Sequence, residues 1–549
     1  MWRIQCGPYF GLRTFSRQSA GSRAPRASVL LICALLTACG LGDSEETAQL
    51  GLVEGFAGLV AADDPRATVV GRDILGGGGN AADAAAAMYF TLAVILPSRA
   101  GLGGGGVCVL FDSSERKGEL IDFLPRRSGS GLVPLGLRAM AALHARHGRQ
   151  RWEEIVGAAE NLARFGHGVS RAFARDLAYA EPLLRGDSEL ARSFRTASGT
   201  VPTEGDRLVQ GTLATVLGGI RAQGASYVHS GPFAERFVDA TLAAGLPIEM
   251  ADLRQSVPRV SEALAVKVGN DMAYFTGPPA GGILAAQLWR VLTDEADYRG
   301  ADGADRGHLF AEAAMRAFAG RRSWLGSPAA DGSEAGAALV EVARIQALLA
   351  DYDPARHTPA GNLMPAPAAV IEDSAGAGFA AADRFGNAVA CSLTMNGLFG
   401  SGRMAPGTGI LLAAPPTSGN DGALSPAAVV IGNPANGDFR FAAAASGGAA
   451  APTALVQVML GVLEDGVSLD EAMRAARFHH GGLPDELFYE SGVPEAVASE
   501  LLSRGHAMQE AAALGQVEAL YCPRGIHDAS ADCVVASDPR GYGLAARAQ

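Results

Sequence analysis

The sequence predicts an α+β protein, and three stretches of the chain support this class. Residues 372–402 (EDSAGAGFAAADRFGNAVACSLTMNGLFGSG) read as two apolar, small-residue strands joined by a turn at residues 383–387. Residues 81–96 read as a nearly all-apolar helix, and residues 130–350 as amphipathic helices alternating with short loops. The chain has 549 residues, 48% of them hydrophobic, so it has enough apolar side chains to bury a large core.

The N-terminus, residues 1–38, has the composition of a targeting segment. Five arginines and no acidic residue accompany an apolar run at residues 29–36, and the sequence LTACG closes it. This order is typical of a secretory signal, and Cys39 stands where bacterial lipoproteins are cut and lipidated. We therefore expect lipid on Cys39, an acidic tether over residues 39–51, and a location in the bacterial cell envelope, facing the periplasm or at the outer membrane. An ordinary signal peptide with an incidental cysteine is the alternative.

The rest of the chain is acidic. The formal net charge is −12 even though the targeting segment is basic. Repulsion between like charges argues against nucleic acid and against an anionic membrane surface as partners. The membrane contact that we expect is therefore made through the N-terminal lipid.

After the tether, a glycine-rich turn at residues 76–79 precedes the apolar helix. Asn80 is a good helix N-cap, and Asp83 lies in the first turn, near the positive end of the helix dipole. The helix stops before Pro97, and because it is short and contains an aspartate, we expect a buried core helix rather than a membrane span. A second glycine run at residues 103–106 leads into the strand VCVLFD. No Gly-Lys-Ser/Thr follows this run, so it is not expected to bind phosphate.

Further along the chain, residues 276–282 (TGPPAGG) form a loop that presents backbone, and residues 309–326 form one of the amphipathic helices. Residues 351–373 contain four prolines and read as an exposed connector. A strand region at residues 429–446 and a helix after Pro452 follow in the C-terminal part.

Seven cysteines are present, three of them in or at the end of the targeting segment. Cys108 and Cys391 lie inside apolar strands, where we expect them to be small core side chains. Cys522 and Cys533 flank a polar turn between two strand-like runs, and an oxidising compartment permits a disulfide between them. No cysteine spacing indicates a zinc site.

Five segments together resemble the γ-glutamyltransferase family. They are GGGGNAADAAAAMYFTLAVILPSRAGLGGGGVCVLFD, GPPAGG, DRFGNAVACSLTMNGLFGSG, ARFHHGGLPDEL and VVASDPRG, in order from about residue 52 to residue 541. The resemblance implies the N-terminal-nucleophile hydrolase fold, a four-layer αββα sandwich. It also implies a precursor that cuts itself into two subunits, whose new N-terminal threonine attacks the γ-glutamyl amide of glutathione and related compounds. Residues 52–373 correspond to the large subunit and residues 374–549 to the small one, intertwined in one domain.

The family's chemistry needs several groups and implies no cofactor. A hydroxyl nucleophile needs a base, which the freed α-amino group of the threonine supplies. Backbone amides must hold the oxyanion, and an arginine and an aspartate must grip the glutamyl end through charge-assisted hydrogen bonds.

Counting back from the turn residue Asp383, the nucleophilic threonine of the family falls on Gly376, and the threonine after it on Ala377. Glycine has no side chain, so neither self-cleavage nor acyl transfer can occur by this route, and we expect an uncleaved chain. Ser374 is the alternative nucleophile. Its hydroxyl would lie on the same strand face but about 6–7 Å away, a displacement that catalysis does not tolerate without rebuilding of the site.

The groups that grip the substrate are also replaced. The arginine that binds the glutamyl carboxylate falls on Leu124, and the paired serines fall on Gly422 and Ala423. The amine-binding aspartate falls near Thr417 or Ser418, after a segment that has lost its polar character.

Other positions of the family's site remain. Thr394 and Asn396 match its active-site threonine and asparagine, and Gly447 and Gly448 match its oxyanion-hole glycines. The alternative interpretation is that these residues survive as scaffold, glycine for backbone geometry and the others for local hydrogen bonds.

The pair His479 and His480, followed by Pro484 and Asp485, also matches the family. Adjacent residues of an element point apart, so these two histidines are not expected to share a metal ion, and we predict no metal site.

The sequence therefore favours an envelope lipoprotein that has lost, or nearly lost, the family's catalysis and now serves in binding or scaffolding. A small peptide or a γ-glutamyl-like compound is the expected ligand, and the sequence indicates no protein partner. The alternative is an active γ-glutamyl transferase or glutathione-hydrolase-type amidase with a displaced nucleophile such as Ser374. A third possibility is a small-molecule binding protein that reuses the emptied pocket.

Overall fold

The computed structural model of the chain describes residues 55–196, 198–321, 333–363, 375–415 and 426–549. The predictions made for residues 1–38, Cys39, the tether at residues 39–51, Ser374, Gly422 and Ala423 concern residues outside these ranges.

Seven antiparallel strands form the larger sheet. Their spatial order is β22 (Leu544–Ala548), β1 (Gly58–Ala62), β11 (Ala377–Asp383), β12 (Ala388–Thr394), β2 (Gly105–Asp112), β3 (Lys117–Asp122) and β8 (Arg259–Glu262). The strands β11 and β12, which follow residue 374, lie between β1 and β2, which precede it. The two predicted subunit-like regions are thus interleaved within one sheet.

Six antiparallel strands form the second sheet. Their order is β21 (Val534–Ser537), β20 (Gln516–Tyr521), β16 (Phe439–Ser446), β15 (Ala427–Gly432), β10 (Asp271–Phe275) and β9 (Leu264–Val268). The remaining strands form short sheets of two or three: β4 (Arg126–Ser128) with β5 (Gly131–Val133), β6 (His167–Gly168) with β7 (Arg207–Leu208), β13 (Met404–Ala405) with β14 (Ile410–Leu411), and β17 (Phe478–His479) with β18 (Leu487–Glu490) and β19 (Met508–Ala511).

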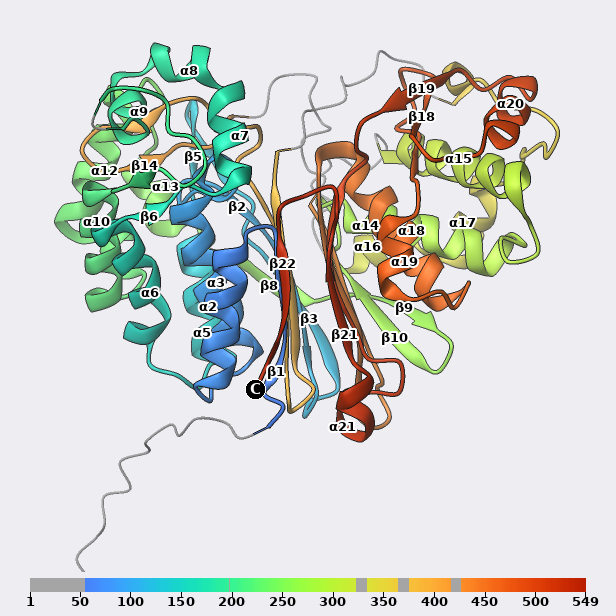
Figure 1. The fold of residues 1–549 in the computed structure, drawn as a ribbon, viewed down its shortest axis with the longest axis horizontal. Helices are drawn as coiled ribbons and strands as arrows, with labels where there is room; N and C mark the ends of the chain where they lie inside the picture. The colour runs from blue at the N-terminus through green and yellow to red at the C-terminus, as the bar shows by residue number, and fades with distance from the viewer. Residues whose placement is uncertain (1–54, 197, 322–332, 364–374, 416–425) are drawn as a thin grey trace, which may run out of the picture. The chain divides into compact units, whose positions relative to one another are not determined.

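Helices cover the outer face of each sheet (Figure 1). On the β1 side these are α2 (Pro65–Gly76), α3 (Ala81–Ile95), α4 (Pro97–Ala100), α5 (Gly136–His147), α6 (Trp152–Phe165), α7 (Arg171–Tyr179), α8 (Glu181–Gly186), α9 (Ser188–Ser193), α10 (Gly211–Gln223), α11 (Ser226–His229), α12 (Gly231–Ala243) and α13 (Met250–Gln255). On the other side are α14 (Gly282–Arg290), η1 (Val291–Glu295), α15 (Gly303–Gly320), α16 (Ser333–Leu339), α17 (Val342–Leu348), α18 (Ala451–Leu463), α19 (Leu469–Arg474) and α20 (Glu495–Ser503). Short helical turns are η4 (Ala360–Asn362), η5 (Gly448–Ala450), α21 (Ile526–Ala529) and η6 (Ser530–Asp532).

Side chains along the strands point alternately to the two faces of a sheet and so pack against the layer on either side. Along β11, Phe379 and Ala381 belong to the buried cluster shared with the helices, whereas Ala380 and Ala382 belong to the cluster between the two sheets. This is the two-residue period of a strand whose faces are both buried. A third cluster joins the second sheet to α14, α15 and α18. The predicted four-layer αββα arrangement is confirmed.

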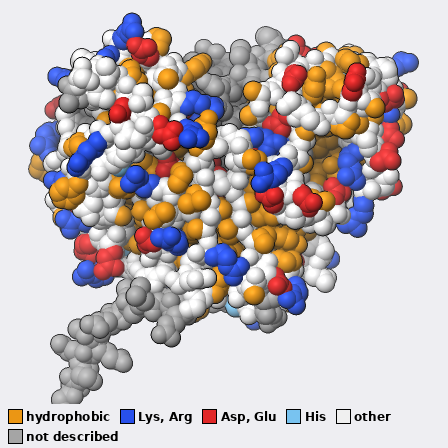
Figure 2. All heavy atoms as spheres, in the orientation of Figure 1, with side chains coloured by type: hydrophobic (Ala, Val, Ile, Leu, Met, Phe, Trp, Pro, Cys, Tyr) orange, Lys and Arg blue, Asp and Glu red, His pale blue; other side chains and the backbone are white. Residues whose placement is uncertain are grey.

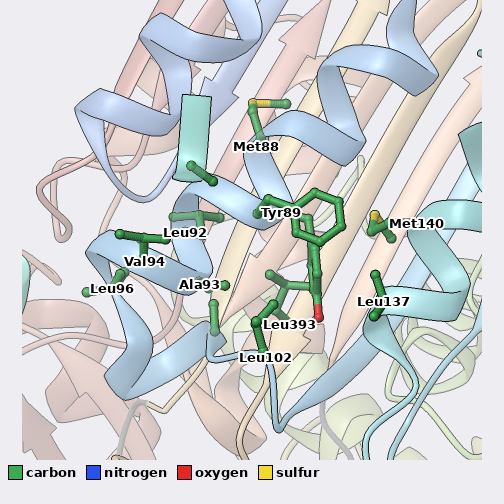
Figure 3. Close-up of a cluster of buried hydrophobic side chains, with 14 of the residues drawn as sticks. Met88, Tyr89, Leu92, Ala93, Val94, Leu96, Leu102, Leu137, Met140 and Leu393 are labelled. Carbon is green, nitrogen blue, oxygen red and sulfur yellow. The ribbon is translucent and has the colours of Figure 1, made fainter. Parts of the chain in front are cut away.

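Helix α3 lies at the centre of the first helical layer. It begins with the predicted Asn80 cap: Asn80 Oδ1 accepts from Asp83 N, and Asp83 Oδ2 accepts from Asn80 N, each at 3.1 Å. Every residue of α3 is buried. Figure 3 shows Tyr89 among the side chains of α5 and beside Leu393 of β12, so the helix packs directly on the strands that carry the site.

The predicted hairpin of residues 372–402 is confirmed where the structure describes it. Strand β11 ends at Asp383 and β12 begins at Ala388, and Asp383 Oδ1 accepts from Phe385 N at 2.8 Å and from Asn387 N at 3.1 Å. One carboxylate therefore organises the turn.

The structure contains two disulfides among the described residues. The expected bond between Cys522 and Cys533 is present, with Cα atoms 4.2 Å apart. The prediction that Cys108 and Cys391 are only small core residues is wrong. They lie directly opposite each other on β2 and β12 and are bonded, with Cα atoms 4.1 Å apart. The cause is the strand register, which the apolar pattern of either strand alone does not reveal.

The prediction of helices and loops for all of residues 130–350 is wrong in part. Strands β8, β9 and β10 lie within residues 259–275 of this region, and the short strands β5, β6 and β7 also fall in it. One of the expected helices also differs in extent: the helix expected at residues 309–326 is α15, which begins earlier, at Gly303.

On the face shown in Figure 2, acidic and basic side chains are interspersed. None of the described helices combines the length and the apolar character needed to cross a bilayer.

Candidate functional site

The predicted catalytic positions that the structure describes meet where interior strands of the two sheets end. Gly376 directly precedes β11, Thr394 ends β12, and Gly447 follows β16. Between them lies a pocket of about 20 Å³, which is room for about one water molecule. Its described lining comprises Ala375, Gly376, Ser392, Leu393, Thr394, Asn396, Gly397, Pro426, Ser446, Gly447, Gly448 and Ala451, and none of these side chains is charged.

Gly376 is buried and has φ +156°, a backbone conformation that side chains disfavour. A Cβ atom added there would lie 3.0 Å from Leu393 O and 3.5 Å from the Cβ of Ser446. The position therefore offers neither a nucleophile nor easy space for one.

Thr394 and Asn396 form a local hydrogen-bonded turn. Asn396 N donates to Thr394 Oγ1 at 2.8 Å, and Asn396 Nδ2 donates to Ala414 O at 3.0 Å. These bonds agree with the scaffold interpretation. However, Asn396 Oδ1 is buried and accepts no hydrogen bond from the described residues, so the pocket contains one polar atom that is ready to accept an N–H group.

Gly447 and Gly448 turn the chain from strand β16 into η5 and α18. Their φ values are +109° and +60°, and the ideal Cβ position of Gly447 lies 2.7 Å from Gly515 Cα, so only glycine fits there. Neither N–H group donates to another described residue. Both glycines line the pocket, where their N–H groups lie at the start of a helix.

Leu124 does not belong to this pocket. Its side chain is buried in the cluster between the two sheets, and its N–H donates to Asp122 Oδ1 at 3.0 Å. Arg126, two residues on, forms an ion pair with Asp122 at 2.9 Å. The nearby guanidinium is therefore engaged by Asp122, and Leu124 supplies only apolar contact.

Three residues beside the pocket were not anticipated from the sequence. Ser446, the last residue of β16, donates from Oγ to Asp63 Oδ2 at 3.0 Å, and Gly378 N donates to the same oxygen at 2.7 Å. The carboxyl groups of Asp63 and Glu518 lie close enough to interact, and both are almost completely buried. The serine is the signal that sequence reasoning could have used, because it directly precedes the two glycines.

Burial raises the pKa of Asp63 and raises the pKa of Glu518 well above its usual value, and the charge of Asp63 adds to the effect on Glu518. Two buried carboxyl groups in contact cannot both ionise at low cost, so they share one proton. The upward shift in the pKa of Glu518 has two main causes, its burial and the neighbouring charge of Asp63.

A second polar group, away from the pocket, is the histidine cluster: His308, Glu312, His357, His480, Asp485 and His506. Two triads of it, His308 with Glu312 and His506, and His357 with His480 and Asp485, hold ligand atoms within 4.8 Å of one another. These are the residues that could hold a metal ion.

Hydrogen bonds already occupy most of the ligand atoms of the cluster. His357 contacts Glu312 Oε1 at 2.7 Å through Nδ1 and Asp485 Oδ1 at 3.0 Å through Nε2, so both of its nitrogens donate. Gly482 N donates to His480 Nδ1, which leaves the proton of His480 on Nε2, facing Asp485. The side chains of the histidine cluster therefore form a hydrogen-bonded network. His479, whose Nδ1 contacts Thr453 Oγ1 at 2.9 Å, lies outside both triads.

A family model and individual relatives both match most of the chain. The family model described as Gamma-glutamyltranspeptidase matches residues 67–131, 124–415 and 423–548. The glutathione hydrolase proenzyme of Escherichia coli K12 is 28% identical over 543 residues, covering 89% of this chain and 91% of that protein. The acylase ACY 1 proenzyme of Pseudomonas sp. strain SE83 is 28% identical over 506 residues, covering 82% of this chain and 87% of that protein.

Solved structures show the same fold. Cephalosporin acylase from Bacillus halodurans superposes with a TM-score of 0.77 at 20% identity, covering 90% of this chain and 96% of that one. The gamma-glutamyltranspeptidase from Pseudomonas nitroreducens, complexed with L-DON, gives a TM-score of 0.51 at 25% identity, covering 57% of this chain and 98% of that one. The architecture is therefore the four-layer sandwich of the N-terminal-nucleophile hydrolases.

Proposed function

The chain belongs to the gamma-glutamyltranspeptidase family, and from this premise we propose that it has lost the family's threonine chemistry and acts in binding or scaffolding. The observation that carries the proposal is Gly376. Self-cleavage needs a side-chain oxygen or sulfur after the scissile bond, and acyl transfer needs the same atom. Gly376 has neither, and without a cut no free α-amine exists at this strand to act as base.

The described part of the pocket supports binding of an uncharged group. It contains no cationic side chain to pair with a glutamyl carboxylate, and Leu124 lies in the core between the sheets. The unpartnered Oδ1 of Asn396 and the N–H groups of Gly447 and Gly448 can together hold an amide. We propose as ligand a small peptide or γ-glutamyl-like compound whose neutral amide end enters this pocket.

We also propose that the protein is an envelope lipoprotein with lipid on Cys39. The basic segment, the apolar run and LTAC support this location. Labelled fatty acid should enter the wild-type protein in a bacterial host and should be absent from Cys39→Ala, which should accumulate as an unprocessed or soluble form. Absence of label from the wild type would refute lipid anchoring.

The second candidate function is an active γ-glutamyl transferase or glutathione-hydrolase-type amidase that uses Ser374. The names of the relatives, which are hydrolase and acylase proenzymes, favour this alternative. It requires a cut before Ser374 and a substrate moved by about two residue rises along the strand, about 6–7 Å.

A chromogenic γ-glutamyl anilide, together with a gel of the mature protein, separates the two candidates. The gel must be run under reducing conditions, because Cys108 and Cys391 join the regions on either side of the expected cut. We expect one band near the full mature mass and no anilide turnover. Two stoichiometric fragments, or release of the chromophore, would establish the alternative.

A further inference from the structure

Ser446 directly precedes a sharp turn between a strand and a helix. It ends β16, Gly447 and Gly448 reverse the chain with φ +109° and +60°, and η5 and the 13-residue helix α18 follow at once. The segment Ala444-Ala445-Ser446-Gly447-Gly448 has small residues two positions before and after the serine. Ser446 itself remains in the strand, where it pairs with Gln516, and the two glycines that follow it make the turn.

The hydroxyl of Ser446 has a basic partner. Its Oγ donates to Asp63 Oδ2 at 3.0 Å, and Gly378 N fixes the same carboxylate at 2.7 Å. The carboxyl group of Glu518 lies beside that of Asp63, and burial raises the pKa of both groups. A buried carboxylate that is more basic than usual is a suitable acceptor for the proton of a serine.

Ser446 also lies where the missing side chain of Gly376 would be. The ideal Cβ of Gly376 would come within 3.5 Å of the Cβ of Ser446, and both residues line the same pocket. The N–H groups of Gly447 and Gly448, which donate to no other described residue, lie at the same pocket, at the positive end of α18.

We propose that Ser446 is a nucleophile, with Asp63 as its base and Glu518 as a positioning residue, and that it hydrolyses esters or amides of small, uncharged acyl groups. The lack of charged side chains in the described lining of the pocket sets this substrate class. The inference goes beyond the proposed function, which concerns the lost chemistry at Gly376 and predicts no turnover of γ-glutamyl compounds in either case.

The reaction balances with water as the only co-reactant. Ser446 Oγ forms a bond to the acyl carbon while its proton passes to Asp63, and the carbonyl oxygen takes up negative charge facing the two glycine N–H groups. The bond from carbon to the leaving oxygen or nitrogen then breaks, and the leaving group takes the proton from Asp63. Water attacks the acyl-serine, Asp63 relays its proton back to Ser446 Oγ, and the free acid leaves.

The decisive experiment is covalent labelling of the intact purified protein with a fluorophosphonate, followed by digestion and mass spectrometry. We expect the adduct on Ser446. Hydrolysis of p-nitrophenyl acetate should fall about 100-fold or more in Ser446→Ala and in Asp63→Asn, as loss of a nucleophile or its base requires.

Ser401→Ala is the matched control, because the Ser401 hydroxyl bonds to Leu412 O on a neighbouring loop and does not line the pocket. It should keep both the adduct and the rate. Glu518→Gln, which removes the second carboxyl group beside Asp63, should shift the limb of the pH profile that reports Asp63, as a positioning role requires. The labelling result on the wild type does not depend on the folding of any variant. An unlabelled Ser446, or a Ser446→Ala variant with the wild-type rate, would overturn the proposal.

Discussion

At the scale of single residues, the loss at Gly376 is a loss of backbone conformation as well as of a side chain. In an enzyme cut before this position, the residue has no preceding peptide, so its φ angle is unconstrained. In the intact chain, φ is +156° and the carbonyl oxygen of Leu393 is 3.0 Å from the place of a Cβ. Restoring a threonine thus meets strain that the cut enzyme does not have.

Gly376→Thr should therefore destabilise the protein by about 1–3 kcal/mol and leave the chain uncut. Thermal unfolding followed by circular dichroism measures the first effect, and a reducing gel the second. Gly211→Thr is a matched control, because its Cβ would meet nothing within 4 Å and its φ is not in the left-handed range. Stoichiometric fragments from Gly376→Thr would show that the rest of the cleavage machinery is intact.

Glu518 gives a second prediction, which concerns how the stability of the folded protein depends on pH. Its folded pKa is raised well above the usual value, by burial first and by Asp63 second. A group with a raised folded pKa contributes its stability fully below its unfolded pKa, about 4.3, and loses it as the pH rises through the folded value. The wild type should therefore lose stability relative to Glu518→Gln, which carries no charge, as the pH rises above the unfolded pKa. Equal slopes of melting temperature against pH would contradict this result.

The sequence allowed part of the candidate site to be predicted and not the rest. Gly376, Thr394, Gly447 and Gly448 could be placed from motifs that lie along the chain, and the structure brings them to one pocket. Asp63 and Glu518 could not be paired in this way, because 455 residues separate them and only the packing of β1 near β20 brings them together. Local patterns do not encode that contact.

At the scale of elements, the periodicity of the sequence predicted which segments are buried better than it predicted which strands pair with each other. Helix α3 and the hairpin of β11 and β12 were expected from apolar runs and their caps. The edge strand β9 and its neighbour β10 were missed. In β9, Leu264 and Val266 alternate with exposed Ala265 and Lys267 in the two-residue period of a half-buried strand. The register that joins Cys108 to Cys391 needs both strands at once.

The histidine cluster joins α15 to the segment around His357 and to Asp485, and it gives a prediction about how these elements are held together. Burial lowers the pKa of His357, but Glu312 and Asp485 raise it by more, so the net pKa is raised. Burial raises the pKa values of Glu312 and Asp485, but their partners lower both to about 2. The two ion pairs are therefore complete between about pH 4.5 and pH 6.5, are weakened on the acidic side as the carboxylates protonate, and are lost on the basic side as the pH passes the folded pKa of His357.

His357→Gln should cost about 3 kcal/mol near pH 5.5, because it leaves buried Glu312 with one partner fewer. The cost should shrink as the pH rises through the folded pKa of His357. Urea unfolding at a series of pH values measures this dependence, with His527→Gln, a histidine with 40% of its side chain exposed, as the control. A cost that does not change with pH would show that packing, not charge, is the contribution of His357.

At the scale of the whole molecule, the fold makes the two subunit-like regions inseparable. Strands β11 and β12 lie between β1 and β2, and β22 pairs with β1, so the larger sheet alternates between the two regions. The second sheet also contains strands of both regions, which meet where β10 pairs with β15. The order of family motifs along the sequence predicted this architecture. It did not predict the covalent link between the regions, the disulfide of Cys108 and Cys391.

A chain cut artificially in the connector should therefore stay assembled. With a site-specific protease sequence inserted between residues 370 and 371, cleavage should give one band on a non-reducing gel, because Cys108 and Cys391 join the two pieces, and two bands after reduction. Even when reduced, the pieces should elute together from a size-exclusion column without denaturant, because each sheet would lose interior strands on separation. Cys108→Ala with Cys391→Ala is the control, since it should give two bands on either gel and still elute as one species. Separation of the pieces in native buffer would mean that the interleaved sheets contribute less to cohesion than the disulfide does.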